Sequence, residues 1–164
     1  MKLHIRVDDP EEGDPPVSTA QIEKLESVLE EELPLLYREI EKYAQVEVSV
    51  SFLSVDEMRE VNKNHRGVDE PTDVLTFPLW EEEGCFKPSV PFCLLPLGDI
   101  LICQEEAERE HALGRVGTLC LMLAHGFLHL MGWDHDTPEK ELKMWERQGT
   151  LGLKLSNAME VLQQ

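Results

Sequence analysis

The sequence has few basic residues. It contains 15 lysines and arginines against 33 aspartates and glutamates, which gives a net charge of −18 over 164 residues. Binding to nucleic acid draws mainly on lysine and arginine to neutralise phosphates, so this balance opposes non-specific attachment to RNA or DNA. The charge is unevenly placed: residues 58–79 carry three basic and four acidic side chains (net −1), and residues 112–133 carry one arginine (net +1). These two segments, in which a site is proposed below, are the least acidic parts of the chain, although an uncharged helix interior would account for the second completely.

Long hydrophobic runs are also missing. No apolar stretch reaches the roughly 18 residues that a membrane-spanning helix needs. The first residues, MKLHIRVDDPEEGD, turn acidic after seven positions and lack the apolar stretch of a signal peptide. We therefore expect a cytoplasmic protein with no membrane segment.

Cysteine is scarce and scattered. The four cysteines form no C-x-x-C pair, and without an export signal they are expected to be free thiols. A disulfide or a shared metal ion between Cys85 and Cys93 is the alternative. A chain of this length, with 41% hydrophobic residues, can bury a core without disulfides or a structural metal. Any metal ion that it binds is therefore free to be catalytic.

Polarity patterns along the chain predict short strands interleaved with helices. Capping boxes, Ser18 with Gln21 and Ser54 with Glu57, predict two helix starts, and the second helix should run to about residue 64. Pro34 is expected to break or restart the first helix. Alternating or short apolar runs predict strands at residues 2–7, 46–53, 74–77 and 99–102.

The second half predicts three more helices. A polar helix after residue 102 is expected to end at Gly114, residues 115–131 are apolar nearly all round and predict a buried helix, and Thr137 with Pro138 should begin an amphipathic helix. Residues 8–16 and 80–93 are expected to be irregular. We predict an α+β fold, with α/β as the alternative: a single domain over residues 1–164, in which a mixed sheet of about four strands packs with helices around a central apolar helix.

Three of the six histidines fall within eleven residues. The segment HGFLHLMGWDH, residues 125–135, has the spacing H-x-x-x-H-x-x-G-x-x-H. On a helix, His125 and His129 lie on one face. Gly132 can adopt the positive φ that ends a helix and turns the chain back, which would bring His135 toward the other two rings.

Three imidazoles suit Zn²⁺ and leave a fourth position for water, which is the arrangement of a catalytic zinc site. Ni²⁺, Cu²⁺ and Fe²⁺ also accept imidazole, so another divalent transition metal is an alternative. Hydrogen-bonded core histidines are the alternative to a metal site. Asp134 and Asp136 flank His135, where they can orient a ligand or simply favour the start of the next helix.

The chain resembles the YbeY endoribonucleases, also called rRNA maturation factors. The resemblance rests on HGFLHLMGWDHD at 125–136, NHRGVDEPTDVLTFPL at 64–79 and LGDILI at 97–102, and it spans nearly the whole chain. Trp133 stands where the family usually has tyrosine, and His65 where it often has an aromatic residue.

The resemblance implies an α+β fold with a zinc-like ion on His125, His129 and His135. It also implies cleavage of single-stranded RNA in 16S rRNA 3′-end maturation and ribosome quality control. The implied partners are rRNA, the small ribosomal subunit and ribosomal proteins. Arg66 matches an invariant arginine of the family, which implies a role in catalysis or substrate binding.

One residue of a peptidase site is missing. Gly126 stands where zinc peptidases with H-E-x-x-H carry the glutamate that takes a proton from water. A metal ion can lower the pKa of bound water from 15.7 to about 7, so hydrolysis does not depend on that glutamate. A positioned base contributes about 10² to 10⁴ in rate, so we expect a slow or highly specific enzyme.

Phosphodiester cleavage also requires a cation near the phosphoryl oxygens. Guanidinium binds such oxygens in a bidentate way, so Arg66 is predicted to be catalytic, with Lys63 and His65 as substrate-binding residues. The alternative for Arg66 is a surface ion pair with Asp69 or Asp73. For Asp73 we favour a structural role, accepting backbone hydrogen bonds at the turn.

Three functions are weighed. The main prediction is a metal-dependent single-strand endoribonuclease. A zinc peptidase is suggested by the metzincin-like spacing and opposed by Gly126. A non-catalytic ribosome assembly factor stabilised by its metal is suggested by the net charge of −18, since an acidic surface suits basic ribosomal proteins.

Overall fold

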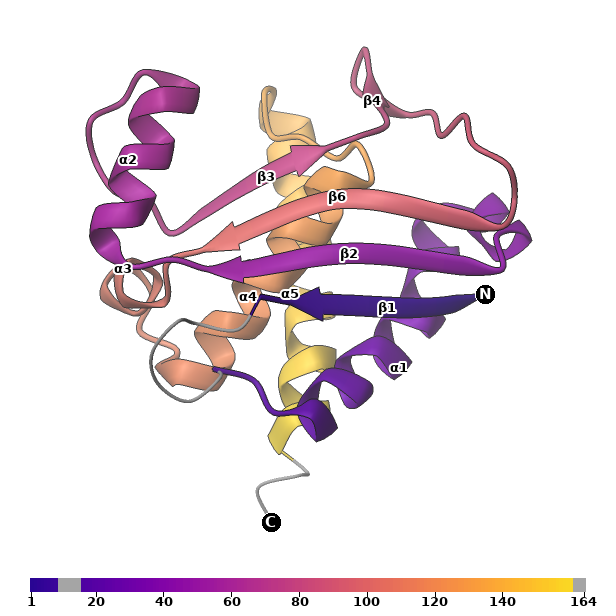
Figure 1. Cartoon of the computed structure of the whole chain (residues 1–164), viewed down its shortest axis with the longest axis horizontal. Helices are drawn as coiled ribbons and strands as arrows, with labels where there is room; N and C mark the ends of the chain where they lie inside the picture. The colour runs from indigo at the N-terminus through magenta and orange to yellow at the C-terminus, as the bar shows by residue number, and fades with distance from the viewer. Residues whose placement is uncertain (9–15, 161–164) are drawn as a thin grey trace.

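A computed structural model of the chain describes residues 1–8 and 16–160. The expected loop at 8–16 falls mostly on residues 9–15, which lie outside the described residues. Four strands form one mixed sheet in the order β1-β2-β6-β3, with the first three parallel and β3 antiparallel to β6 (Figure 1). Their bounds are β1 Lys2–Val7, β2 Gln45–Phe52, β3 Val74–Pro78 and β6 Leu94–Ile102. This is the mixed four-stranded sheet that the sequence predicts.

The helices lie on both faces of the sheet. One face packs against α1, α4 and α5, and α2 covers one end of the other face (Figure 1). A short helix, α3, and a 3-10 turn connect these elements. The bounds are α1 Thr19–Leu36, the 3-10 turn Arg38–Lys42, α2 Val55–Arg66, α3 Gln104–Glu110, α4 Gly114–Leu130 and α5 Pro138–Glu160.

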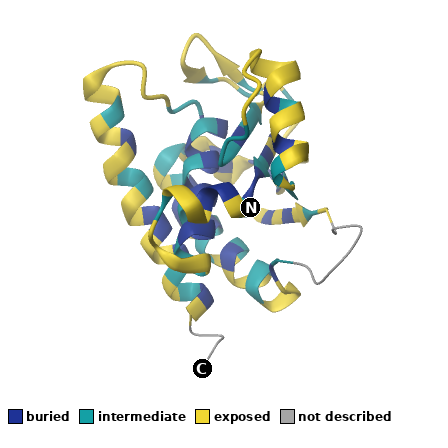
Figure 2. Cartoon of the chain, turned by 90° about the vertical axis from the view of Figure 1, so that its left-hand side faces the viewer, coloured by how far each residue is buried: buried dark blue, intermediate teal, exposed yellow. Residues whose placement is uncertain are grey.

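The main core lies between the sheet and the layer of α1, α4 and α5. Alternate residues of β1 and β2 point into it, and α4 is buried along most of its length because its sequence is apolar on nearly every side. Burial of aliphatic side chains contributes about 25 cal/mol per Å² and is the main favourable term here. Figure 2 shows the buried residues gathered in this layer and the exposed ones along the outer face of α5, the long helix that leads to the C terminus.

A smaller cluster holds α2 in place on the opposite face. Met58 of α2 packs there with Leu75 of β3 and Cys103, all of them buried. The helix begins at the predicted capping box, in which Ser54 and Glu57 exchange side-chain and backbone hydrogen bonds. Gly67, with a φ of 73°, ends it two residues later than expected. Both capping boxes are therefore confirmed, including the one at Ser18.

Pro34 does not break the first helix, so this expectation was wrong. The helix continues to Leu36 with Pro34 inside it. The proline falls in the last turn, where it removes one backbone hydrogen bond. The neighbouring Leu29 and Leu33 are fully buried, and their burial holds the helix in place past the proline.

Two boundaries in the second half also differ from expectation. Gly114 begins α4 with a φ of 74°, whereas the preceding polar helix already ends at Glu110. Strand β6 begins at Leu94, five residues before the expected start at Asp99, because its first residues pair with β2 ahead of a register shift. Pairing with a distant strand, which no local pattern encodes, decides this boundary.

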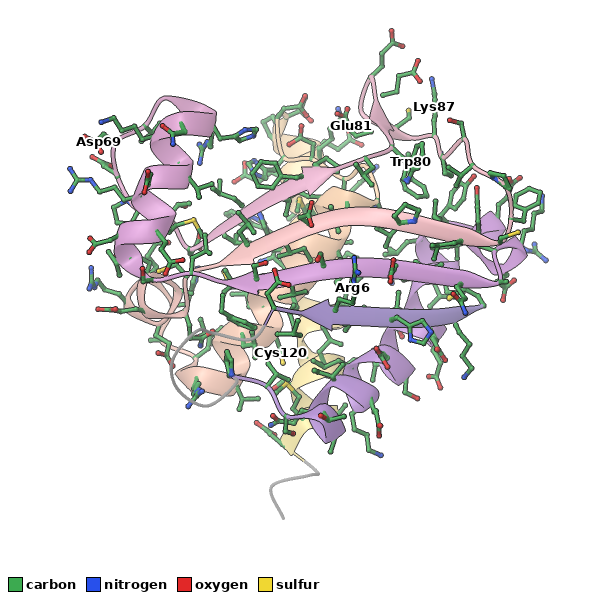
Figure 3. The ribbon with its side chains drawn as sticks, in the orientation of Figure 1. Arg6, Asp69, Trp80, Glu81, Lys87 and Cys120 are labelled. Carbon is green, nitrogen blue, oxygen red and sulfur yellow. The ribbon has the colours of Figure 1, made fainter. Side chains whose placement is uncertain are left out.

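The predicted irregular segment 80–93 contains a small hairpin. Strands β4 (Glu81–Glu82) and β5 (Cys85–Phe86) pair there. The segment is anchored where the indole nitrogen of Trp80 donates a hydrogen bond to the carbonyl of Pro96, at 2.5 Å. Figure 3 shows Trp80 and Glu81 where the chain leaves the end of β3.

Within residues 1–8 and 16–160, no single helix combines the length and apolar character needed to cross a membrane. Only α3 and α4 taken together reach that length and composition, and they meet at a bend of 103°.

Candidate metal centre

Three histidine rings converge at the C-terminal end of α4. His125 and His129 lie one turn apart on the helix, with ring centroids 4.4 Å apart. The ring of His135 lies 5.4 Å from that of His129 and 6.1 Å from that of His125. One nitrogen of each ring lies within 4.8 Å of those of the other two. This spacing allows the three rings to hold one ion together.

A glycine produces this convergence. α4 ends at Leu130, and Gly132 follows with a φ of 87°, as the sequence predicts. A Cβ atom at this position would also lie 2.8 Å from the backbone nitrogen of Phe86 in the small hairpin. The bend therefore requires glycine for its conformation and for its close contact with β5.

Gln148 of α5 fixes the ring of His125. This residue was not identified from the sequence. Its side-chain oxygen lies 2.8 Å from Nδ1 of His125. A carbonyl oxygen only accepts hydrogen bonds, so Nδ1 carries the proton and Nε2 keeps its lone pair for an ion. Gln148 lies 23 residues after His125 in a helix of ordinary amphipathic pattern, which offers no motif to search for.

Burial keeps two of the three imidazoles neutral. Desolvation lowers the pKa of His125, and it lowers the pKa of His129 to about 4, with further lowering by the neighbouring rings. Metal ions bind neutral imidazole, so these rings are ready for a cation near neutral pH. A cavity of about 130 Å³ opens beside His129, bounded by Thr76, Pro78 and Trp133 among others.

The depressed pKa of His129 predicts how the stability of the metal-free protein depends on pH. The unfolded chain takes up a proton below about pH 6.5, and the folded chain does so only near pH 4. The contribution of His129 to stability is thus complete above pH 6.5 and is lost as the pH falls toward 4. Because the ring is only partly buried, solvent screening reduces the expected loss at pH 5 to about 1 kcal/mol.

Urea unfolding in the presence of a chelator at pH 7 and pH 5 measures this loss. His129→Gln is the matched control, since it keeps a polar side chain that does not titrate. The free energy of unfolding of the wild type should fall by about 1 kcal/mol more than that of the variant. An equal fall in both proteins, or a larger fall in the variant, would show that His129 is not held neutral by the fold.

The two aspartates that flank His135 have local roles. Asp134 accepts a hydrogen bond from the backbone nitrogen of His135 at 2.8 Å. Asp136 pairs with Lys140 at 3.2 Å, beside Thr137, whose hydroxyl caps α5 by accepting from the Lys140 nitrogen. Asp134 thus shapes the loop, and Asp136 belongs to the start of α5.

Lys63, His65 and Arg66 lie together in the last turn of α2, and all three are exposed. They are not part of the histidine group. The ring of His65 rests on Phe77 of β3, with centroids 4.5 Å apart. Thr76, the neighbouring residue on the same strand, borders the cavity beside His129. The basic end of α2 and the cavity beside His129 therefore border neighbouring residues of the edge strand β3.

The alternative ion pair of Arg66 is not formed. Asp69 pairs with Arg59 at 2.9 Å (Figure 3 labels Asp69), and this hydrogen bond lowers the pKa of the Asp69 carboxyl. Asp73 pairs with His111. Among the described residues, Arg66 has no carboxylate partner, so its guanidinium remains exposed to solvent.

Asp73 accepts a backbone hydrogen bond at the turn, as predicted, and it also pairs with His111. One carboxylate oxygen accepts from the Val74 nitrogen at 2.8 Å, and the other lies 3.1 Å from Nε2 of His111. Glu110 completes this group; burial raises its pKa, and the neighbouring Asp73 raises it further. The negative charge of Asp73 also acts on His125, whose pKa it raises against the larger effect of burial.

All four cysteines are free, as predicted. Cys85 and Cys93 are exposed, and Cys103 and Cys120 are buried. Burial raises the pKa of the Cys120 thiol to about 12, which makes it unreactive at neutral pH. The alternative of a disulfide between Cys85 and Cys93 is wrong.

Comparison with known proteins shows which family the chain resembles. Residues 14–156 match the sequence model of the family described as "Endoribonuclease YbeY". A protein named Endoribonuclease YbeY from Halalkalibacterium halodurans is 42% identical over 77% of this chain and 83% of its own length. Another of that name, from Shouchella clausii, is 41% identical over 68% of this chain and 73% of its own length.

A solved structure has a similar fold. The solution structure of TM1509 from Thermotoga maritima superposes with a TM-score of 0.54 at 30% identity, covering 96% of this chain and 93% of that one. The family match covers all three histidines, the basic end of α2 and Gln148. The chain belongs to the YbeY endoribonuclease family.

Proposed function

We propose that this chain, acting as a single metallohydrolase domain over residues 1–164, cleaves phosphodiester bonds in single-stranded RNA with the help of a divalent metal ion. The observation that carries the proposal is the convergence of His125, His129 and His135, whose ligand nitrogens lie within 4.8 Å of one another beside an open cavity. Membership of a family described as endoribonucleases supports RNA as the substrate.

The donor set fits a zinc ion. Three imidazoles would hold it, two of them kept neutral by burial and one oriented by Gln148. A divalent ion bound there supplies Lewis acidity and makes water acidic enough to ionise near neutral pH. Zn²⁺ is the proposed cofactor, and another divalent transition metal can bind the same nitrogens.

Arg66 is the proposed catalytic cation from the protein itself. Its guanidinium is exposed and, among the described residues, has no ion-pair partner. It can therefore bind phosphoryl oxygens and stabilise the charge that grows on them during cleavage. Lys63 and His65 in the same helical turn are the proposed phosphate contacts, with His65 held against Phe77.

Replacing Arg66 tests this role. Arg66→Ala should lower kcat/KM for RNA cleavage by about 10²- to 10³-fold, as loss of one charge-stabilising donor does in other enzymes. Arg66→Lys should restore part of the rate, because the charge returns without the bidentate geometry. Arg59→Ala, on the same helix but already paired with Asp69, is the matched control and should cleave like the wild type. Full cleavage by Arg66→Ala would refute the assignment.

We further propose that the RNA substrate is ribosomal. The family resemblance supports action in 16S rRNA 3′-end maturation and ribosome quality control in the cytoplasm, with the small ribosomal subunit and its proteins as partners and no membrane association. An RNA spanning the 16S 3′ end and its precursor tail, incubated with the purified protein, should yield one main product. Cleavage scattered along the RNA without preference would argue against this specificity.

A non-catalytic assembly factor is the second candidate, and the net charge of −18 favours it. An acidic surface suits contact with basic ribosomal proteins. This candidate predicts loss of helical circular dichroism on metal removal and no nuclease activity at any protein concentration. A zinc peptidase has less support, because Gly126 is buried and offers no carboxylate.

A further inference from the structure

Three cavities form one groove that leads away from the histidines. The first, about 130 Å³, borders His129 and Trp133; the second, about 240 Å³, borders Trp133, Lys140 and Lys143; the third, about 300 Å³, borders Trp133, Lys143 and Arg147. Trp133 borders all three, the first two also share Gly132 and Asp134, and the last two share Lys143, so the cavities lie side by side. Each is at or below the lower limit of small-molecule sites, roughly 300 to 1,000 Å³. A shallow groove of this kind suits an extended ligand.

The far part of the groove carries positive charge. Lys140, Lys143 and Arg147 are spaced by three and four residues on α5, so they lie on one face of the helix. The two lysines pair with Asp136 and Glu139, each at 3.2 Å, in exposed positions. Such surface pairs contribute only about 0 to 1 kcal/mol, so a phosphate can take over either lysine at little cost. Arg147 is half-buried and forms no ion pair with any described residue.

Carboxylates limit the length of this positive segment. Glu81 and Asp134 border the first cavity, Asp134 also borders the second, and Glu146 borders the third beside Arg147. One or two phosphates can be held between them, at Lys143 and Arg147.

Trp133 provides a fixed aromatic surface. The preceding residue, Gly132, packs closely on the hairpin backbone and so positions Trp133. Part of the indole packs against the main core. The remainder borders the groove. Stacking of a nucleic acid base on an aromatic side chain contributes about 1 to 3 kcal/mol and tolerates any base.

We infer that this groove binds the stretch of single-stranded RNA next to the cleaved bond, with one base stacked on Trp133 and one or two phosphates on Lys143 and Arg147. The inference rests on the proposed function for the identity of the ligand. It adds a binding site on α5 that lies outside the histidine group and outside the basic end of α2.

Binding of a fluorescein-labelled 2′-O-methyl RNA decamer to the full-length protein tests the aromatic contact. Fluorescence anisotropy gives the Kd, and a gel run afterwards confirms that the oligonucleotide is intact. Trp133→Leu should weaken binding by about 5- to 150-fold. Trp133→Tyr keeps a ring and should retain most of the affinity, which guards against a folding defect in the leucine variant. Trp145→Leu, on the exposed outer face of α5, should bind like the wild type.

The salt dependence of Kd tests the charged part of the groove. Lys143→Gln combined with Arg147→Gln should reduce the slope of log Kd against log salt concentration by about 1.4, because each phosphate that is no longer neutralised lowers the slope by about 0.7. Lys24→Gln, an exposed lysine of α1, is the matched control and should leave the slope unchanged.

The binding experiments can refute the inference about the groove without refuting the proposed RNA cleavage, and a cleavage assay can do the reverse. Wild-type affinity in Trp133→Leu together with an unchanged salt slope in the double variant, or no binding of the decamer by the wild type, would overturn the groove. Binding that depends on Trp133 and Arg147 supports it, even if unmodified RNA is not cleaved, and in that case only the catalytic proposal fails.

Discussion

Replacing His129 with alanine is expected to remove the metal ion and to lower RNA cleavage by about 10²- to 10⁴-fold or more. Charge stabilisation by a bound divalent ion is worth several kcal/mol, and each 1.36 kcal/mol corresponds to a factor of ten in rate. The two remaining rings belong to different segments, because His125 lies on α4 and His135 in the loop beyond Gly132. They would bind an ion far more weakly without the ring that stands between them.

Elemental analysis of the purified protein, paired with a cleavage assay on the same preparation, measures both effects. His65→Ala is the matched control for metal content, since His65 lies on α2 against Phe77 and should leave one ion per chain. A contaminating nuclease would be present in both the wild-type and the His129→Ala preparations, and it would show as equal cleavage by the two. A His129→Ala protein that keeps its metal ion and its activity would refute the site.

Restoring the missing glutamate is expected to destabilise the protein without producing a peptidase. Gly126 is buried, and a Cβ atom there would lie 2.7 to 3.0 Å from three side-chain carbons of Ile100 on β6. Overpacking of this kind costs about 1 to 3 kcal/mol, and a buried carboxylate without a partner adds a similar or larger cost. We expect Gly126→Glu to lose about 3 kcal/mol or more of unfolding free energy, and Gly126→Ala about 1 to 3 kcal/mol.

Urea denaturation of both variants measures these losses. Gly149→Ala is the matched control, because Gly149 is an exposed helical glycine with nothing within 4 Å of an added Cβ. That substitution should stabilise α5 by about 0.5 to 1 kcal/mol. If Gly126→Ala were as stable as Gly149→Ala, the close packing of α4 on β6 would be wrong.

This packing explains why the peptidase glutamate is missing. The residue after His125 faces the sheet and not the cavity, so glycine there allows the helix to lie directly on Ile100. The chain therefore lacks the peptidase base for a structural reason.

Local patterns in the sequence were sufficient to predict that the three histidines lie close together. The spacing of His125 and His129 fixes their common face on any helix, and Gly132 is the residue that permits the bend toward His135. The same kind of local signal predicted both capping boxes and the start of α5 at Thr137 and Pro138. In each case the determining atoms lie within a few residues of one another, so the sequence shows them directly.

Long-range contacts account for what the sequence could not show. Gln148 reaches His125 only because α5 packs against α4, and His111 meets Asp73 across 38 residues. Asp69 could have paired with either of two arginines on α2, and the turn after Gly67 places it beside Arg59. The early start of β6 likewise depends on its pairing with β2.

X-ray absorption at the zinc edge of the zinc-loaded protein tests the central claim most directly. Three imidazole nitrogens at about 2.0 to 2.1 Å and one further oxygen are predicted, with one imidazole fewer in His129→Ala. A sulfur scatterer near 2.3 Å, or a fourth protein side chain closing the coordination shell, would contradict a three-histidine site with one position open for reaction.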